Sequence, residues 1–170
     1  MLLLIRAEEF ERFLQKRYGT YKRYSGEGGE ALILALNTLI AEAAKQDPSS
    51  DVNTKYNDQG ISTAVLGMPH RGRLATLVAL NDYPARNLLY KIAGNNDIPA
   101  EIRDSIDDIP THIAVSNTKK FSTESGLAEK KAKRVTMTMV HNPSHLESQN
   151  SISMGKTRAK IDDMGIQDTR

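Results

Sequence analysis

The stretch that decides the fold is ISTAVLGMPHRGRL, which runs from Ile61 to Leu74. Its first half, Ile61–Gly67, is short, apolar and partly β-branched and ends in glycine, a pattern typical of a buried strand. Residues 68–73 then form a turn, and an apolar helical repeat begins at Leu74. We therefore predict a strand, a turn and a helix in succession, the arrangement in which α/β proteins place functional loops at strand ends.

The sequence on either side of this stretch predicts an α/β fold with parallel strands flanked by helices. Ser25 is predicted to cap the helix that ends near Lys45, and Pro143 prevents the later strand from continuing. We divide the chain at residue 60, into a helical segment with a polar linker (1–60) and an α/β part (61–170). The further predicted elements are helices over Ala7–Arg17, from the Ser25 cap to about Lys45 and over Ala85–Ile92, a polar loop over Gln46–Gly60 and a strand over Val135–Val140.

Composition excludes several classes of protein. The 170 residues suit one domain, and 23 basic against 21 acidic residues leave a net charge of +2, too close to neutral to predict a nucleic-acid or membrane partner. The absence of cysteine excludes disulfides, thiolate metal sites and cysteine nucleophiles. No apolar run approaches the length of a membrane span, and Met1–Ile5 is too short for a presequence. With 5% aromatic residues, the chain resembles part of a larger body.

Three short motifs carry weak signals. His141 and His145 have the spacing of zinc ligands on a helix, but Pro143 lies between them and no glutamate follows His141, which argues against a metalloprotease site. The Gly-Lys-Thr sequence at 155–157 lacks the upstream glycine of a phosphate-binding loop. The basic run from Lys130 to Arg134 is usually a solvated loop; a small basic binding module is the alternative, and it requires salt-dependent binding to nucleic acid.

The segment GMPHRGRL (67–74) carries the strongest functional signal. It sets His70, Arg71 and Arg73 immediately after a strand, where one turn can aim all three into a cleft. Arginine binds phosphate or carboxylate through paired N–H donors. The alternative is that these arginines only cap acidic groups at the surface, and any single histidine is more often a hydrogen-bonded surface residue than a catalytic one.

Several segments together resemble one enzyme family. GMPHRGRL (67–74), NPSHLES (142–148) and MGKTRAK (154–160) are similar to the thiamine-diphosphate-dependent decarboxylating component of 2-oxoglutarate dehydrogenase and of its relative, 2-oxoadipate dehydrogenase. YKRYSGEGGEALI (21–33) and DIPTHI (108–113) resemble two further segments of that family. The resemblance covers nearly the whole chain, in the family's order. It implies the start of a thiamine-diphosphate-binding domain, truncated within this chain.

The resemblance also implies roles for particular residues. His141 has no counterpart in the family's motifs and is interpreted as structural or exposed, and Thr136 stands where 2-oxoglutarate members carry a further histidine. At Thr111, 2-oxoadipate members carry a small residue and 2-oxoglutarate members an aromatic one. The implied site consists of His70 and His112 as catalytic residues, Arg71, Thr111, Asn142, Ser144 and His145 as substrate-binding residues, Arg73 as a cofactor-binding residue, and no metal ligand.

The family's cofactor is thiamine diphosphate, held with magnesium in the full-length enzyme through a Gly-Asp motif that this chain lacks. Its implied partners are the dihydrolipoyl acyltransferase and dihydrolipoamide dehydrogenase components, and the full-length chain is expected to be a homodimer without nucleic-acid or membrane partners. The implied location is the mitochondrial matrix in a eukaryote and the cytoplasm in a bacterium. The alternative is a catalytically inactive, truncated product with the family fold that acts at most as a binding partner.

Overall fold

A computed structural model describes residues 2–45, 60–95, 109–121, 133–142 and 144–165. These residues form five α-helices, one short 3-10 helix and three strands. In chain order they are α1 (Leu2–Arg17), α2 (Ala31–Ala44), β1 (Thr63–Leu66), α3 (Arg73–Ala79), α4 (Ala85–Ile92), the 3-10 helix η2 (Pro110–His112), β2 (Val115–Phe121), β3 (Lys133–Met139) and α5 (Leu146–Asp163).

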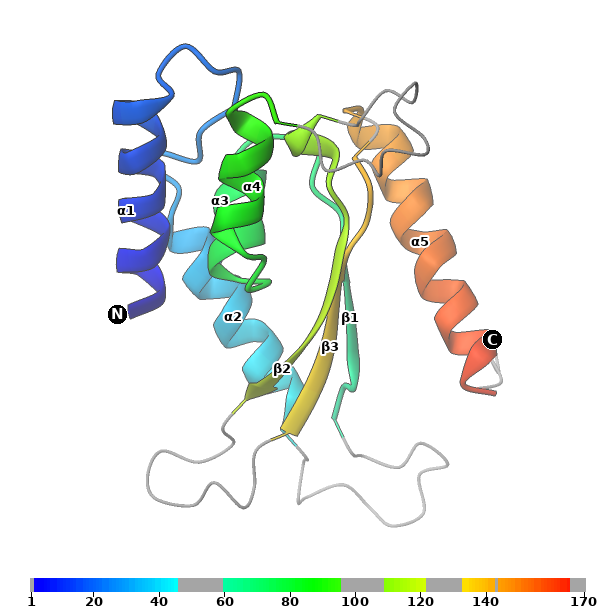
Figure 1. The fold of residues 1–170 in the computed structure, drawn as a ribbon. Helices are drawn as coiled ribbons and strands as arrows, with labels where there is room; N and C mark the ends of the chain where they lie inside the picture. The colour runs from blue at the N-terminus through cyan, green and yellow to red at the C-terminus, as the bar shows by residue number, and fades with distance from the viewer. Residues whose placement is uncertain (1, 46–59, 96–108, 122–132, 143, 166–170) are drawn as a thin grey trace.

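The three strands form one mixed sheet between two layers of helices. The strand order is β1-β3-β2, with β1 parallel and β2 antiparallel to β3. Helices α1 to α4 lie on one side of the sheet and α5 lies on the other (Figure 1). The predicted α/β class is confirmed, and the predicted parallel pairing holds for β1 and β3. The antiparallel strand β2 was not predicted.

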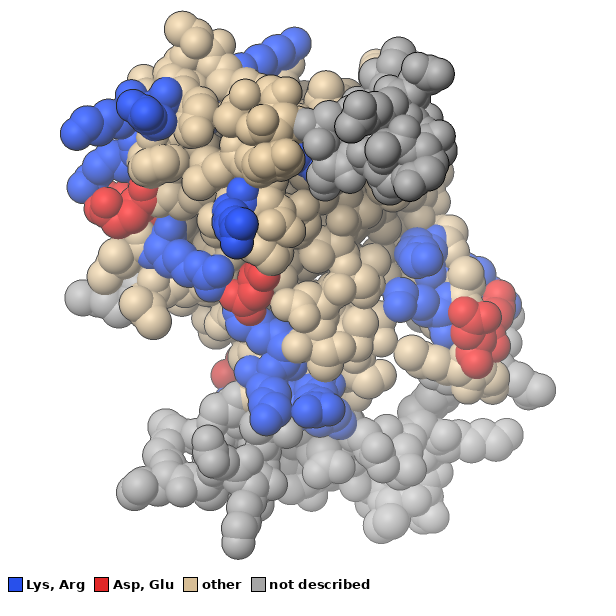
Figure 2. Space-filling model, viewed as in Figure 1, with Lys and Arg blue, Asp and Glu red and all other residues tan. Residues whose placement is uncertain are grey.

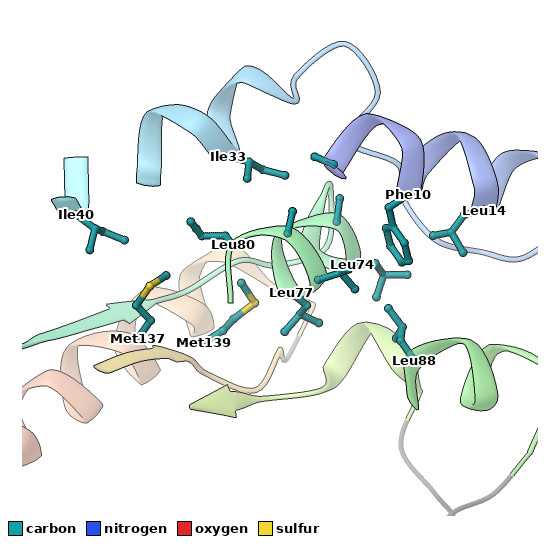
Figure 3. Packing of buried hydrophobic residues seen from close by; sticks show 14 of the residues in the cluster. Phe10, Leu14, Ile33, Ile40, Leu74, Leu77, Leu80, Leu88, Met137 and Met139 are labelled. Atoms are coloured by element: carbon teal, nitrogen blue, oxygen red, sulfur yellow. The ribbon is translucent and has the colours of Figure 1, made fainter. Parts of the chain in front are cut away.

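Alternation along β3 separates the two faces of the sheet. Val135, Met137 and Met139 are buried on the face toward α1–α4, where Figure 3 shows Met137 and Met139 beside the leucines of α3. On the opposite face, Thr136 and Thr138 pair through their hydroxyl groups with threonine and serine of β2, at 3.1 and 3.0 Å. Successive side chains of a strand point to opposite faces, which is why one strand serves both the apolar core and a polar surface.

Helix α3 occupies the centre of the core. All seven of its residues are buried, and it packs against Phe10 and Leu14 of α1 as well as Leu88 of α4 (Figure 3). A helix of this length is marginal in water, so its stability comes from packing; burying a leucine side chain contributes about 1.5–3 kcal/mol. The core therefore draws on residues from both sides of the predicted boundary at residue 60.

The predicted cap of the second helix is wrong. Helix α2 begins at Ala31, with Glu30 at the capping position and no side-chain cap. Ser25 instead donates a hydrogen bond to the carboxylate of Glu11 at 2.9 Å. Glu11 is buried in α1, and a buried carboxylate that lacks donors is costly, which accounts for this contact. Oγ of Ser25 also accepts a 3.0 Å hydrogen bond from the backbone N–H of Glu27, in the turn that precedes α2. Within the described residues, no helix is long and apolar enough to cross a membrane.

Most other predicted elements are confirmed with shifted ends. The helix over Ala85–Ile92 has the predicted bounds, whereas α1 begins five residues earlier than predicted, at Leu2. The predicted loop at 46–60 lies almost wholly outside the described residues. The structure adds α5 to the prediction, a helix whose sequence shows little apolar periodicity.

Candidate functional site

The loops that carry the predicted site residues meet at one end of the sheet. The parallel strands β1 and β3 both end there, and the antiparallel strand β2 begins there, since Val115 pairs with Met139. In Figure 1 this is the upper end, where η2 and the start of α5 also lie. Ligands of open α/β sheets bind at the carboxyl ends of parallel strands. The topology thus gathers the turn before α3, η2 and the loop before α5 where that chemistry is expected.

The turn after β1 is held by the segment that follows α1. The ring of His70 lies 4.4 Å from the ring of Tyr24, and the backbone N–H of Gly72 donates to the carbonyl of Tyr24 at 2.8 Å. Arg71, which is exposed, donates to the carbonyl of Ser25 at 3.2 Å. The two segments approach so closely that a Cβ on Gly26 would lie 3.0 Å from the Cα of Gly72.

Tyr24 contacts the candidate site through the ring of His70 and was not among the predicted site residues. Its backbone has a φ of 47°, a conformation that non-glycine residues rarely adopt and that often marks a functional site. The ammonium group of Lys22 lies 5.3 Å from its ring centre. A hydrogen bond with Tyr24 and the phenolate charge raise the pKa of Lys22. The aromatic–basic run in the sequence was the available signal, but only the fold places it against His70.

The predicted residues of the second and third loops are joined by hydrogen bonds. Nε2 of His112 lies 3.2 Å from Oγ of Ser144, and the side-chain amide of Asn142 donates to the carbonyl of Thr111 at 3.3 Å. The Asn142 side chain also accepts a 2.6 Å hydrogen bond from the backbone N–H of Ser144. That contact supports a φ of 64° at Ser144 and turns its hydroxyl group toward His112.

The exposure of these residues differs. Thr111 and Asn142 are buried, His112 is half-buried, and Ser144 and His145 are exposed. His145 precedes the first turn of α5, and its carbonyl accepts the first helical hydrogen bond, from Gln149. The imidazole and hydroxyl groups are therefore accessible, while the threonine and asparagine hold the loops behind them.

His141 is exposed, and its ring lies 3.3 Å from the carbonyl of His112. The prediction that it is structural or exposed stands with this placement. Among the described residues, no group of three or more His, Asp or Glu side chains is arranged to hold a metal ion.

Arg73 occupies the space between the three loops. It is completely buried, and its guanidinium group donates hydrogen bonds to the carbonyls of Met68, Ile113 and Val140 at 2.8, 2.7 and 2.6 Å. Burial lowers the pKa of Arg73 to about 10, so the side chain is a cation at neutral pH. The resemblance implies that Arg73 binds the cofactor; the structure places its guanidinium group on protein carbonyls.

The two weaker basic motifs lie away from this end of the sheet. Gly155–Thr157 lies within α5, and the hydroxyl group of Thr157 donates to the carbonyl of Ser153 at 2.8 Å, so this sequence does not form a phosphate-binding loop. In the basic run, residues 130–132 lie outside the described part of the chain. Arg134 faces Lys120 at the far end of the hairpin, where Figure 2 shows basic side chains gathered near the lower end of the sheet.

Comparisons with known proteins identify relatives over nearly the whole chain. No protein-family model matches it. It is 36% identical over 157 residues to the "Probable 2-oxoadipate dehydrogenase complex component E1 homolog" of Dictyostelium discoideum, which covers 92% of this chain. It is 33% identical over 158 residues (93% of the chain) to the 2-oxoadipate dehydrogenase complex component E1 of Mus musculus. It is also 33% identical over 159 residues (94% of the chain) to the 2-oxoglutarate dehydrogenase E1 component of Brucella ovis. The matched segment is 14–15% of the length of these curated relatives.

Proposed function

We propose a function for this chain from its family: it belongs, as a segment, to the family of 2-oxoadipate and 2-oxoglutarate dehydrogenase E1 components. We propose that it forms part of an enzyme that oxidatively decarboxylates one of these 2-oxo acids and transfers the acyl group to a lipoyl arm. The observation that supports the proposal most is the convergence of His70, His112 and His145 on three loops at one sheet end. Imidazoles gathered where ligands of α/β sheets bind are suited to acid–base chemistry.

The substrate carries two carboxylates and one keto oxygen, and the site offers groups for each. His70 and His112 are half-buried, so each can present a ring N–H to the keto oxygen, where negative charge develops. The exposed guanidinium group of Arg71 can bind a carboxylate through paired donors. The hydroxyl group of Ser144 and the ring of His145, both exposed at the same end of the sheet, can add further polar contacts to the substrate.

Thiamine diphosphate, when bound, supplies the nucleophilic carbon and the electron sink for loss of carbon dioxide. The donor set fits the reacting end of such a cofactor, because imidazole and hydroxyl hydrogen-bond donors and an exposed cation lie at the strand ends. We assign none of the described residues to magnesium, since they include no metal-ligating cluster. Tyr24 orients the ring of His70, and Asn142 orients Ser144 toward His112.

We propose 2-oxoadipate as the preferred substrate. Thr111 is 5% exposed and directly precedes His112, and its carbonyl is held by Asn142. A small residue here leaves room for a longer carbon chain beside His112. A pocket discriminates a single methylene group by about 1–3 kcal/mol.

The family implies a multienzyme setting. We propose that the complete protein is a homodimer that works with dihydrolipoyl acyltransferase and dihydrolipoamide dehydrogenase components, without a membrane or nucleic-acid partner. Its location would be the mitochondrial matrix in a eukaryote or the cytoplasm in a bacterium.

The test is a decarboxylation assay on a complete E1 polypeptide that includes this chain, with thiamine diphosphate, Mg²⁺ and each 2-oxo acid in turn. We expect turnover that depends on the cofactor and a higher kcat/KM for 2-oxoadipate. A folded protein without turnover on either acid would contradict the proposal and favour the inactive alternative.

A further inference from the structure

We propose that Arg73 is a positioning residue: one buried guanidinium group fixes the three site loops relative to one another. The catalytic consequence of this role rests on the function proposed above. The geometric role does not, because it concerns contacts within this chain.

Each of the three carbonyls that Arg73 contacts lies one or two residues from a predicted site residue. Met68 lies two residues before His70 in the turn after β1. Ile113 directly follows His112. Val140 follows β3 and precedes Asn142 by two residues. Each hydrogen bond therefore anchors its loop next to a predicted site residue, with lengths of 2.6–2.8 Å.

The chemistry of arginine explains why this residue type occupies the position. Burial of a cation is costly unless its donors are paired, and here carbonyls from all three loops accept hydrogen bonds from the two terminal nitrogens of the guanidinium group, while Nε is buried without a partner. The guanidinium plane holds its donors in a fixed fork, so the directions of the carbonyls are fixed with it. A lysine would supply a compact charge without the fork, and an uncharged side chain would remove the donor from the buried carbonyl of Val140 and from the part-buried carbonyls of Met68 and Ile113.

Arg73 can fix the three loops because its own backbone is held in the core. It is the first residue of α3, whose residues are all buried, and its backbone N–H donates to the carbonyl of His70 at 3.0 Å. Helix α3 therefore holds the backbone of Arg73 fixed in the core, and the guanidinium group extends from it to the end of the sheet where the three loops meet. Direct contact with a ligand would require the loops to part, because the side chain is 0% exposed.

The first experiment uses the 170-residue chain with ¹⁵N-labelled histidine. We compare Arg73→Lys and Arg73→Met with Arg86→Met, a change to an exposed arginine of α4 outside the site. In the folded Arg73 variants we expect the ring signals of His70 and His112 to shift and broaden, while Arg86→Met leaves them unchanged. Unchanged ring signals in a folded Arg73 variant would overturn the proposal. Failure of both Arg73 variants to fold would also overturn it, because Arg73 would then serve the whole core.

The second experiment separates positioning from cofactor binding in a complete E1 polypeptide. We expect Arg73→Lys to lower kcat by about 100-fold, the effect of misplacing reacting groups by about 1 Å, with little change in KM or in the affinity for thiamine diphosphate. A large loss of cofactor affinity with kcat retained would overturn the proposal and identify Arg73 as a direct cofactor ligand. An inactive wild-type protein would contradict the proposed function, and the ring signals would still decide the geometric role.

Discussion

Substitution of Gly67 by alanine tests the packing of α5 against the end of β1. A Cβ at this position would lie 2.3 Å from Oγ of Ser153 and 3.0 Å from both Cγ and Nε2 of Gln149. Real Cβ atoms do not approach other atoms so closely, so side chains of α5 must move. Gln149 is 1% exposed, so any movement of its side chain must displace the groups packed around it. Ser153 can rotate only by giving up its 2.9 Å hydrogen bond to the carbonyl of Gln149.

The expected cost follows from these contacts. Overpacking of a filled site costs about 1–3 kcal/mol. Restricting the unfolded chain by replacing glycine recovers about 0.4–1 kcal/mol where the backbone is compatible. We therefore expect Gly67→Ala to lower the free energy of unfolding by about 1–2 kcal/mol, with a Tm decrease of about 2–4 °C per kcal/mol for a chain of this size.

The assay is chemical and thermal denaturation of four chains that form a double-mutant cycle: wild type, Gly67→Ala, Ser153→Ala and the double variant. Because Ser153→Ala removes the oxygen that the new methyl group would meet, the double variant should recover at least about 0.5 kcal/mol relative to additivity. Gly155→Ala is the matched control: a Cβ there meets nothing within 4 Å, so α5 should gain about 0.5–1 kcal/mol. Additive effects, or a stable Gly67→Ala chain, would refute this account of the packing.

Three further predictions concern buried or half-buried groups. Thr111→Tyr should shift the ratio of kcat/KM values in a complete E1 polypeptide toward 2-oxoglutarate by about 10-fold or more; an unchanged ratio would show that this position does not set substrate choice. Glu11→Gln should destabilise the chain by about 1–3 kcal/mol in urea denaturation, because the Glu11 carboxylate accepts hydrogen bonds from Ser25 and from the N–H of Gly26, each at 2.9 Å; stability equal to wild type would be inconsistent with that role. Burial raises the pKa of Tyr21 above 10.0, so the unfolded chain loses this proton first and stability should fall as the pH rises through 10; Tyr21→Phe should remove that part of the pH dependence, and identical slopes in both chains would argue against it.

The parts of the fold that were predictable are those whose sequence carries its own periodicity. The strand that includes Thr63–Leu66 and the helix over Ala85–Ile92, which Pro84 precedes, are local signals, and both are confirmed. Strand β2 was missed because polar residues lie on both of its faces: Asn117 and Lys119 point toward the helices, where they bond to carbonyls at the end of α3. Tertiary partners, rather than an apolar pattern, specify that strand.

In the candidate site, too, some features have a local sequence signal and others depend on tertiary packing. The residue types at the strand ends indicated a functional loop at His70, and the fold places Nε2 of His112 3.2 Å from Oγ of Ser144. The roles that the resemblance implies for these residues stay predictions. The place of Arg73 could not be predicted from spacing, since an Arg-Gly-Arg turn contains two guanidinium groups with no local difference between them. Helix α3 buries Arg73 completely, while Arg71 points outward; that distinction arises from long-range packing.

The most direct test of the proposed function is the turnover of a complete E1 polypeptide that includes this chain and carries His70→Ala. His70 lies on a turn, half-buried, with the ring of Tyr24 as its described contact, so its loss should leave Tm nearly unchanged. If His70 acts on the reacting groups, turnover of the 2-oxo acid should fall by about 10²–10⁴-fold, as for a positioned proton-transfer group. Near-normal turnover in the folded variant would contradict the account and reassign His70 to a structural role.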